Sequence, residues 1–336
     1  MMNETNLTLV EDDVGLRVIE GIAFVSITLL ILTGNCLCLL VLRLARDMNH
    51  VTRVLLISLT AADLLMGTVV AAPVLGTVIT HGWPYGYVFC AISASGNQIC
   101  ATTSLFSLLL INAERYICIC RPLRYPSIVT VNRARVAVVC VWVFALFLGL
   151  SNCFLPGRIA NYHEYLHSCF FDPLSGEPDV MGTLCVILFV FAPFPVLILM
   201  YIRIFVIARR HAKDMEARAI AMYEQAQRLS LQENGRVSLD QGRRRFFPEY
   251  KAAKTFGIIT LTYAMAWMPF FSIVIYENLT MTKAPRGLTV TASCMALSNS
   301  WLNVLVYYAR NAIFRTTAKR MLSGRRHRYS ASSNRF

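Results

Sequence analysis

Three ionisable side chains border a long uncharged segment of the sequence. Residues 64–113 contain no Asp, Glu, Lys or Arg; Asp63 precedes this segment, and Glu114 and Arg115 follow it. A carboxylate in apolar surroundings is costly to bury, so its presence at Asp63 indicates a functional site. An arginine next to a carboxylate can form a two-point ion pair, and such a pair can hold or release a neighbouring element. The two positions therefore predict ion binding at Asp63 and switching at Arg115.

The composition explains why these charges stand so far apart. Of the 336 residues, 56% are hydrophobic and 15% are charged, whereas soluble domains average about 25% charged residues. Runs of about twenty apolar residues match the hydrocarbon layer of a membrane, which is ~30 Å thick. The sequence therefore predicts an all-α membrane protein, a bundle of seven transmembrane helices at residues 18–44, 54–79, 86–113, 134–156, 179–207, 253–276 and 288–309.

The basic residues predict the orientation of this bundle. With the N-terminus outside the cell, the extracellular side receives only four of the 32 lysines and arginines, namely Arg17, Arg158, Lys283 and Arg286. Such an excess of positive charge on the cytoplasmic side is the rule for membrane proteins. The net charge of +13 is therefore explained without nucleic acid. It favours contact with membrane lipids and with an acidic partner on the cytoplasmic side.

The same pattern divides the chain into five predicted parts. They are an extracellular N-terminus (1–17), the transmembrane domain (18–309) with a third cytoplasmic loop inside it (208–250), a helix on the membrane surface (310–322) and a cytoplasmic tail (323–336). Asn3 and Asn6 lie in Asn-X-Thr sequons and are predicted glycosylation sites. Cys90 and Cys169 face an oxidising compartment and are expected to form a disulfide. Cys153 is the competing partner.

Polar residues at membrane depth define a candidate ion site around Asp63. Its expected companions are Ser104, Asn299 and Asn303, whose oxygen atoms together with the carboxylate could hold a sodium ion or a cluster of waters. The alternative is that Asp63 hydrogen-bonds to these residues only to pack helices together.

A second set of residues is suited to conformational switching. Glu114, Arg115 and Tyr116 end the third span, and Glu249 at the start of the sixth offers Arg115 a second acid; the alternative is that Arg115 only extends to the membrane surface. Proline bends a helix because it removes a backbone hydrogen bond. The remaining members of this set are Trp267 and Pro269 in span six, Tyr201 after Pro193 in span five, and Tyr307 after Asn303 in span seven.

The order and spacing of these motifs resemble a known family. The residues that carry the likeness are Gly34-Asn35, Ala62-Asp63, Trp83, Cys90, Glu114-Arg115-Tyr116, Trp142, Cys169, Pro193, Trp267 with Pro269, and Asn303 with Tyr307. The chain resembles rhodopsin-like (class A) G-protein-coupled receptors over about residues 20–320, and within them the biogenic-amine receptors. The resemblance implies a plasma-membrane receptor for a small molecule, a heterotrimeric G protein as partner, and arrestin and a receptor kinase as further partners.

The departures from that family concern the ligand. Asn97 stands where amine receptors carry the aspartate that binds the amine, and Val304 replaces a usual proline of span seven. The expected ligand-contacting set is Asn97, Gln98, Thr102, Cys185, Phe189, Trp267, Phe270, Phe271, Val274 and Ser293, none of them acidic. A buried cation needs a counter-charge, so we expect a neutral or mostly apolar ligand.

Several alternatives for the ligand stay open. The cation of an amine could be bound at the rim by Glu277 or Asp179, or the receptor could signal without a ligand. Asn97 could also simply hydrogen-bond to a neighbouring helix. An enzyme is not expected, because the sequence has no Ser/His/Asp set, metal-ligand cluster or phosphate-binding loop. A seven-helix transporter or channel is less favoured, because Asp63 alone provides no polar path across the membrane.

Overall fold

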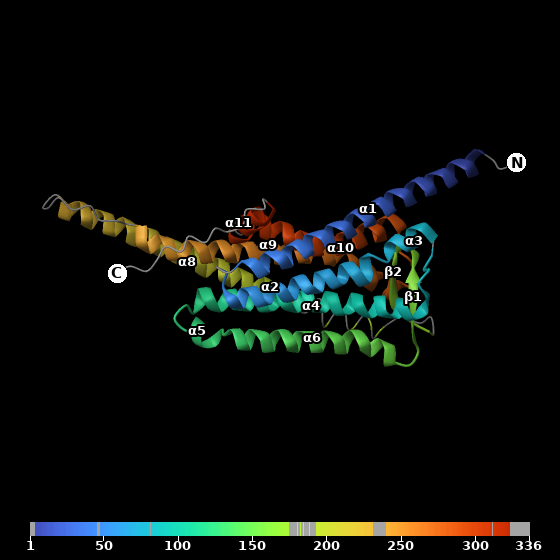
Figure 1. Cartoon of the computed structure of the whole chain (residues 1–336), viewed down its shortest axis with the longest axis horizontal. Coiled ribbons are helices and arrows are strands. Elements are labelled where there is room, and N and C mark those ends of the chain that lie inside the picture. Colours follow the sequence, from blue (N-terminus) through green and yellow to red (C-terminus); the bar gives the residue numbers. More distant parts are fainter. Residues whose placement is uncertain are drawn as a thin grey trace.

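The protein is a bundle of long helices with a small β-hairpin at one end (Figure 1). This computed structural model describes residues 4–45, 48–80, 82–174, 180, 182, 184, 188, 193–230, 240–310 and 312–322. The long helices are α1 (Glu4–Leu44), α2 (His50–Leu65), α4 (Gly86–Cys120), α6 (Val131–Phe154), α8 (Pro193–Ser230), α9 (Asp240–Thr280) and α10 (Arg286–Arg310). Shorter elements are the π-helix η1 (Met66–Ala71), α3 (Val74–Thr80), α5 (Tyr125–Ile128), β1 (Arg158–His163), the 3₁₀-helix η2 (Glu164–Leu166), β2 (Ser168–Pro173) and α11 (Ala312–Leu322).

Helix α4 lies at the centre of the bundle. It packs against α2, α6, α8 and α9 and also contacts both strands of the hairpin. Its contact with α6 is unusually close, because a Cβ atom added to Gly149 would lie 2.4 Å from Cγ1 of Ile99. A central helix that touches most of the others can transmit a shift from one end of the bundle to the other.

The helix bounds agree with the predicted spans, with extensions at several ends. Among the described residues, five segments are long and apolar enough to cross a membrane: Gly15–Leu44, His50–Thr80, Gly86–Cys120, Val131–Phe154 and Gly257–Thr280. Helix α10 covers the predicted seventh span, and α8 covers the part of the predicted fifth span from Pro193. Helix α1 begins at Glu4, ahead of the predicted residue 18, so helix continues into the predicted N-terminal segment.

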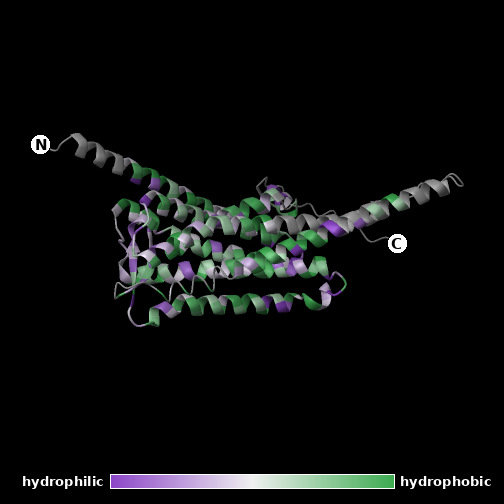
Figure 2. Ribbon diagram, turned by 180° about the vertical axis from the view of Figure 1, so that it is seen from behind, coloured by the Kyte–Doolittle hydropathy of each residue, from purple (hydrophilic) through white to green (hydrophobic). Residues whose placement is uncertain are grey.

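The helices of the bundle consist largely of apolar residues, as the hydropathy colouring of Figure 2 shows. On α6, Val139, Phe147 and Phe154 are 59%, 69% and 85% exposed. Exposed apolar side chains along a whole helix face are unfavourable in water and favourable against lipid tails. The bundle is thus built to be surrounded by hydrocarbon.

The second transmembrane segment of the bundle is not a uniform α-helix. It consists of α2, η1 and α3, and in η1 the amide of Ala72 bonds to the carbonyl of Gly67, five residues earlier, at 2.9 Å. Asn49 caps the start of α2, because its side-chain oxygen accepts a hydrogen bond from the amide of Val51 at 2.9 Å. The wider π-helical turn changes which face the residues beyond it present.

The hairpin covers the end of the bundle opposite to α5 (Figure 1). Strands β1 and β2 pair antiparallel, with Tyr162 opposite Cys169 and His163 opposite Ser168. The chain turns into β1 at Gly157, whose positive φ of 76° is readily adopted only by glycine. The predicted disulfide is present: Cys90 and Cys169 are bonded with a Cα–Cα distance of 5.4 Å, and Cys153 instead lies 3.4 Å from the Ser95 hydroxyl.

Candidate functional site

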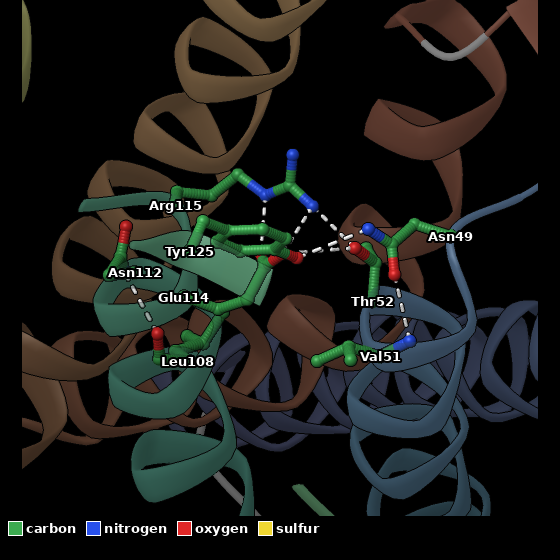
Figure 3. A network of polar contacts seen from close by, with 8 residues as sticks. All are labelled: Asn49, Val51, Thr52, Leu108, Asn112, Glu114, Arg115 and Tyr125. Carbon is green, nitrogen blue, oxygen red and sulfur yellow. Dashed lines mark hydrogen bonds and ion pairs between the residues drawn. The ribbon is translucent and has the colours of Figure 1, made fainter. Parts of the chain in front are cut away.

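Arg115 lies at the end of α4 next to α5, called the inner end because it is predicted to face the cytoplasm, and is held by several polar groups (Figure 3). Its Nε is 2.5 Å from one carboxylate oxygen of Glu114, and a terminal guanidinium nitrogen is 2.9 Å from the other. Arg115 also donates to the hydroxyl of Thr52 on α2. Glu114 and Arg115 are only 4% and 6% exposed. Arg115 therefore does not simply reach to the membrane surface; it is locked inside the bundle.

Helix α5 completes this inner network. The hydroxyl of Tyr125 donates to Glu114 at 2.6 Å and accepts from Asn49 at 3.1 Å. Burial, and next the neighbouring carboxylate of Glu114, raise the pKa of Tyr125 above its ordinary value. The hydroxyl therefore stays protonated and acts as a donor to Glu114. Thr52, Asn49 and Tyr125 were not predicted from the sequence as members of this site.

A buried hydrogen bond joins α4 to α9 one turn deeper in the bundle. The side-chain amide of Asn112 donates to the Thr260 hydroxyl at 2.8 Å and to the Leu108 carbonyl at 2.9 Å. Asn112 and Thr260 are 2% and 7% exposed. This hydrogen bond joins α4 to α9 at the inner end of the bundle. The predicted second acid, Glu249, has a side chain outside the described residues, so that part of the switch stays a prediction.

The residues around Asp63 partly match the predicted ion site. Asp63 is 1% exposed; it accepts hydrogen bonds from Asn303 at 3.0 Å and from Ser104 at 3.4 Å. Asn299, the third predicted companion, and its neighbour Ser300 are also buried, at 1% and 3% exposed. The side-chain oxygens of Asn299 and Asn303 are buried and make no hydrogen bond.

A hard cation such as sodium prefers oxygen ligands. One carboxylate with hydroxyl and amide oxygens nearby fits such an ion, and buried acceptors without donors fit it further. Among the residues that the structure describes, no group of three or more His, Cys, Asp or Glu is arranged to hold a metal. The Asp63 site thus fits a singly charged cation better than a transition metal.

The aromatic residues of α9 form one stacked group. Trp267 stacks on Phe271 with a centroid distance of 5.3 Å and meets Phe270 edge-on at 6.0 Å. The group extends to Tyr263, which lies 6.0 Å from Trp267 and donates to the backbone carbonyl of Ala101 on α4 at 3.3 Å. Helix α9 runs unbroken past Pro269. A shift of Trp267 would therefore displace Tyr263 and its hydrogen bond to α4.

Strand β2 adds a residue to the predicted ligand region. The ring of Phe170 lies 5.9 Å from that of Phe270, so the outer hairpin contacts the aromatic group. Phe170 directly follows Cys169, and no sequence pattern connects it to span six. The hairpin therefore forms the outer wall of the region.

The other predicted ligand contacts lie on three helices. On α4, Asn97 and Gln98 are half-buried and Thr102 is buried; Val274 on α9 is half-buried and Ser293 on α10 is buried. Cys185 and Phe189 fall outside the described residues. Whether these residues contact a ligand stays a prediction.

The remaining switch residues occupy the inner ends of their helices. Tyr116 is half-buried and packs near Ile119 and Ile204. Tyr307 is 3% exposed, and its ring lies 6.2 Å from Phe314 of α11. Helix α10 continues unbroken through Val304, which stands where the family usually has a proline in span seven. The side chain of Tyr201 lies outside the described residues.

The outer ends of α1 and α10 carry an ion pair that the sequence did not predict. Arg286 binds both carboxylate oxygens of Glu20, at 3.1 Å and 2.7 Å. Glu20 is 4% exposed. This acid belongs to the outer part of the bundle but is already neutralised by an arginine.

These features define a membrane protein of the seven-helix receptor class, with a buried arginine–glutamate pair at one end and a disulfide-bonded hairpin at the other. The sequence matches the family described as 7 transmembrane receptor (rhodopsin family) over residues 34–307. That range covers most of the 336 residues, and the chain belongs to this family. The match confirms the predicted fold, the predicted relation to class A receptors and the expectation that the chain is not an enzyme.

Relatives of the chain include amine receptors. The chain is 27% identical over 303 residues to the alpha-1A adrenergic receptor of Oryzias latipes, covering 86% of this chain and 63% of the relative. It is 29% identical over 257 residues to that of Rattus norvegicus, covering 72% and 54%. The histamine H2 receptor of Rattus norvegicus is 26% identical over 314 residues, covering 92% and 81%. The matched part of the chain thus covers less than two thirds of the length of each of these two adrenergic receptors.

Proposed function

We propose that the chain is a plasma-membrane receptor that transmits an extracellular small-molecule signal to a heterotrimeric G protein. Its N-terminus is outside and its C-terminus inside, in agreement with the distribution of lysine and arginine. The observation that carries the proposal is the locked Arg115 at the inner end of α4, with Glu114, Thr52 and Tyr125 around it. A buried guanidinium that a change of packing can release is a suitable contact for a cytoplasmic partner.

The proposed mechanism starts at the aromatic group of α9. A ligand near Asn97, Phe270 and Phe271 shifts Trp267, and α9 moves away from α4 at its inner end. That movement separates Asn112 from Thr260, which are 2.8 Å apart in this closed arrangement. Arg115 then becomes available to the C-terminal segment of the Gα subunit. The ligand drives this change only to the extent that it binds the open arrangement more tightly.

The chemistry of the region favours a neutral or mostly apolar ligand. The described side chains around the aromatic group provide amides, hydroxyls and rings, and these offer hydrogen bonds without net charge. An amine cation there would lack the counter-charge that a buried charge requires. Adrenergic and histamine relatives support the general position of the site, and Asn97 argues against the same ligand chemistry.

A carboxylate at position 97 tests this proposal. We expect the Asn97→Asp variant to respond to amines, while the wild type does not, at equal surface expression and with second-messenger output as the measurement. Gln98→Glu adds a carboxylate to the same ligand-contacting set about 100° further around α4, so comparison of the two variants shows whether the exact position of the acid matters. If the wild type already responds to amines, Asn97 is not the determinant and the proposed ligand chemistry is wrong.

An amine receptor that uses a rim acid is the second candidate within the receptor class. Glu277 is the described rim acid, and it already binds Lys283 at 3.1 Å and the amide of Ala284 at 2.9 Å. Asp179 lies outside the described residues. Loss of an amine response in Glu277→Gln or Asp179→Asn would favour this candidate.

Further parts of the proposal concern ions and other partners. We propose that a sodium ion binds beside Asp63 and stabilises the closed arrangement, which predicts a sodium-dependent basal output that Asp63→Asn abolishes. Arrestin and a receptor kinase would act at the same inner face, and the basic residues of α11 would contact lipid headgroups. A transporter or channel would instead show solute flux without any G-protein response.

A further inference from the structure

His167 occupies a buried position where the outer hairpin meets three helical elements. It is 9% exposed, and its ring lies 5.0 Å from that of Phe24 on α1, at an angle of 63°. Its Nδ1 lies 3.3 Å from the Thr77 hydroxyl of α3 and 3.4 Å from the Tyr162 hydroxyl of β1. The receptor mechanism proposed above makes no use of this residue.

The other ring nitrogen of His167 faces charge. Its Nε2 makes no hydrogen bond and lies 3.8 Å from the Glu20 carboxylate, which the two contacts with Arg286 already occupy. The hairpin contributes Glu164, which lies 3.6 Å from Arg17 of α1. The charges that face His167 therefore cancel: two carboxylates stand against two guanidinium groups. A proton on His167 would leave the cluster with one excess positive charge.

A small cavity gives this buried imidazole access to water. Its volume is ≈20 Å³, and its lining includes His167, Tyr162, Glu164 and Arg286. A space of this size holds about one water molecule. A proton can therefore reach the ring without prior unfolding of the hairpin.

The backbone at His167 is also held in a conformation that is released easily. Its φ of 48° and ψ of 30° lie in the left-handed region, which residues other than glycine adopt at a cost. The contacts of the side chain hold the residue there. Loss of these contacts would free the hairpin on one side of the Cys90–Cys169 disulfide.

We propose that His167 is an extracellular proton site, and that its protonation releases the hairpin from α1, α3 and α10. Thr77, Tyr162 and Glu20 are the groups that the imidazole contacts in the docked form, and Arg286 opposes its charge. Phe170 follows three residues later and contacts Phe270, so release also loosens the outer wall of the ligand region. This inference concerns the hairpin itself and does not depend on the G-protein proposal.

The direction of the effect follows from linkage. Burial of the ring lowers the pKa of His167 in the docked form. The attraction of Glu20 opposes this shift, and the repulsion of Arg286 adds to it. In the released form the pKa returns to about 6.5. Well above that value both forms are unprotonated, and docking keeps its full stability. As the pH falls through about 6.5, the released form takes up the proton first and is favoured. A difference of one pKa unit changes the docked-to-released ratio about tenfold.

The full chain in lipid nanodiscs tests the proposal through its thermal unfolding midpoint at about pH 7.5 and about pH 5.5. We expect acid to lower the midpoint of the wild type, and His167→Asn to lose most of that pH dependence. Asparagine tolerates the left-handed backbone and cannot be protonated. His163→Asn is the matched control on the same hairpin, because His163 bonds to Asp172 at the rim; it should retain most of the wild-type acid sensitivity. If acid lowers the thermal unfolding midpoint equally in the wild type and in His167→Asn, the proposal is overturned.

A titration of the histidine rings by nuclear magnetic resonance provides a second measurement on the wild-type protein. The signal of His167 is assigned as the one missing in His167→Asn or, if that variant does not fold, in His167→Gln. We expect its midpoint below the ordinary value of about 6.5. A midpoint at or above that value contradicts the proposal, whatever the signalling assays show.

Discussion

Both ends of the bundle bury an arginine–glutamate pair, but the two pairs are built differently. At the inner end, Arg115 binds Glu114, the residue before it in the sequence. At the outer end, Arg286 binds Glu20, which is 266 residues away. The inner pair itself closes within one helix, and contacts from Thr52 of α2 and Tyr125 of α5 surround it. The outer pair joins α1 to α10, so breaking it separates two helices.

This difference suggests a division of roles between the two ends. The inner arginine also depends on Thr52 of α2 and, through Glu114, on Tyr125 of α5, and these are contacts that a moving helix can exchange. The outer arginine lies over the ring of Tyr165 as well, with its Cζ 5.4 Å from the ring centroid. We therefore expect substitutions at the outer pair to affect mainly stability, and substitutions at the inner network to affect mainly signalling.

The largest expected effect is that of Glu20→Ala on stability. Removal of this carboxylate takes away both hydrogen bonds by which Arg286 joins α10 to α1, and breaking a buried ion pair costs about 3 kcal/mol or more. The measurement is the thermal unfolding midpoint of the purified receptor. Glu164→Ala is the matched control, because the Glu164 side chain is 51% exposed and an exposed pair contributes at most about 1 kcal/mol. Equal midpoints for the two variants would show that the outer pair does not hold the bundle together.

A smaller effect, on signalling, is expected for Asn112→Ala. Loss of the buried bond to Thr260 removes about 1 kcal/mol from the closed arrangement, so basal second-messenger output should rise about fivefold where the open form is rare. Thr260→Val should act in the same direction. The basal output of the double variant should be only slightly higher than that of either single variant, because both substitutions remove the same hydrogen bond. Additive increases would contradict a direct coupling between the two residues.

The smallest of these effects is expected for Tyr125→Phe. This change removes the donor to Glu114 at a half-exposed position, where a hydrogen bond contributes roughly 0.5 kcal/mol. We expect basal output to rise about twofold, with no change in the unfolding midpoint. Ser127→Ala removes an exposed hydroxyl from the same short helix and is the control. A fall in basal output in Tyr125→Phe would show that α5 supports the active arrangement instead.

The sequence sufficed for features that depend on local pattern and membrane depth. Long apolar runs predicted the helices, and two cysteines expected to face an oxidising compartment predicted the disulfide. The contacts of Asp63 with Asn303 and Ser104 were also predicted, because few polar residues exist at that depth and each needs a partner.

The features that escaped prediction are contacts between elements far apart in the sequence. Glu20 was assigned to the first span without a role, and Phe170 was an ordinary loop residue. Asn112 was one polar residue among many in α4. Transmembrane helices are apolar on all sides, so periodicity does not show which face meets which neighbour. A pairing such as Glu20 with Arg286 depends on the rotation of both helices, which only the assembled bundle sets.

The π-helical turn Met66–Ala71 has a consequence for how such a receptor can diversify. It lies between Asp63, which belongs to the middle of the bundle, and Thr77, which contacts His167 at the outer end. One residue corresponds to about 100° of helix rotation. A single-residue deletion in this turn would leave the apolar character of the second transmembrane segment unchanged, yet it would aim α3 at different neighbours. Insertions and deletions at this position would thus let the outer face evolve new contacts while the polar group around Asp63 is inherited intact.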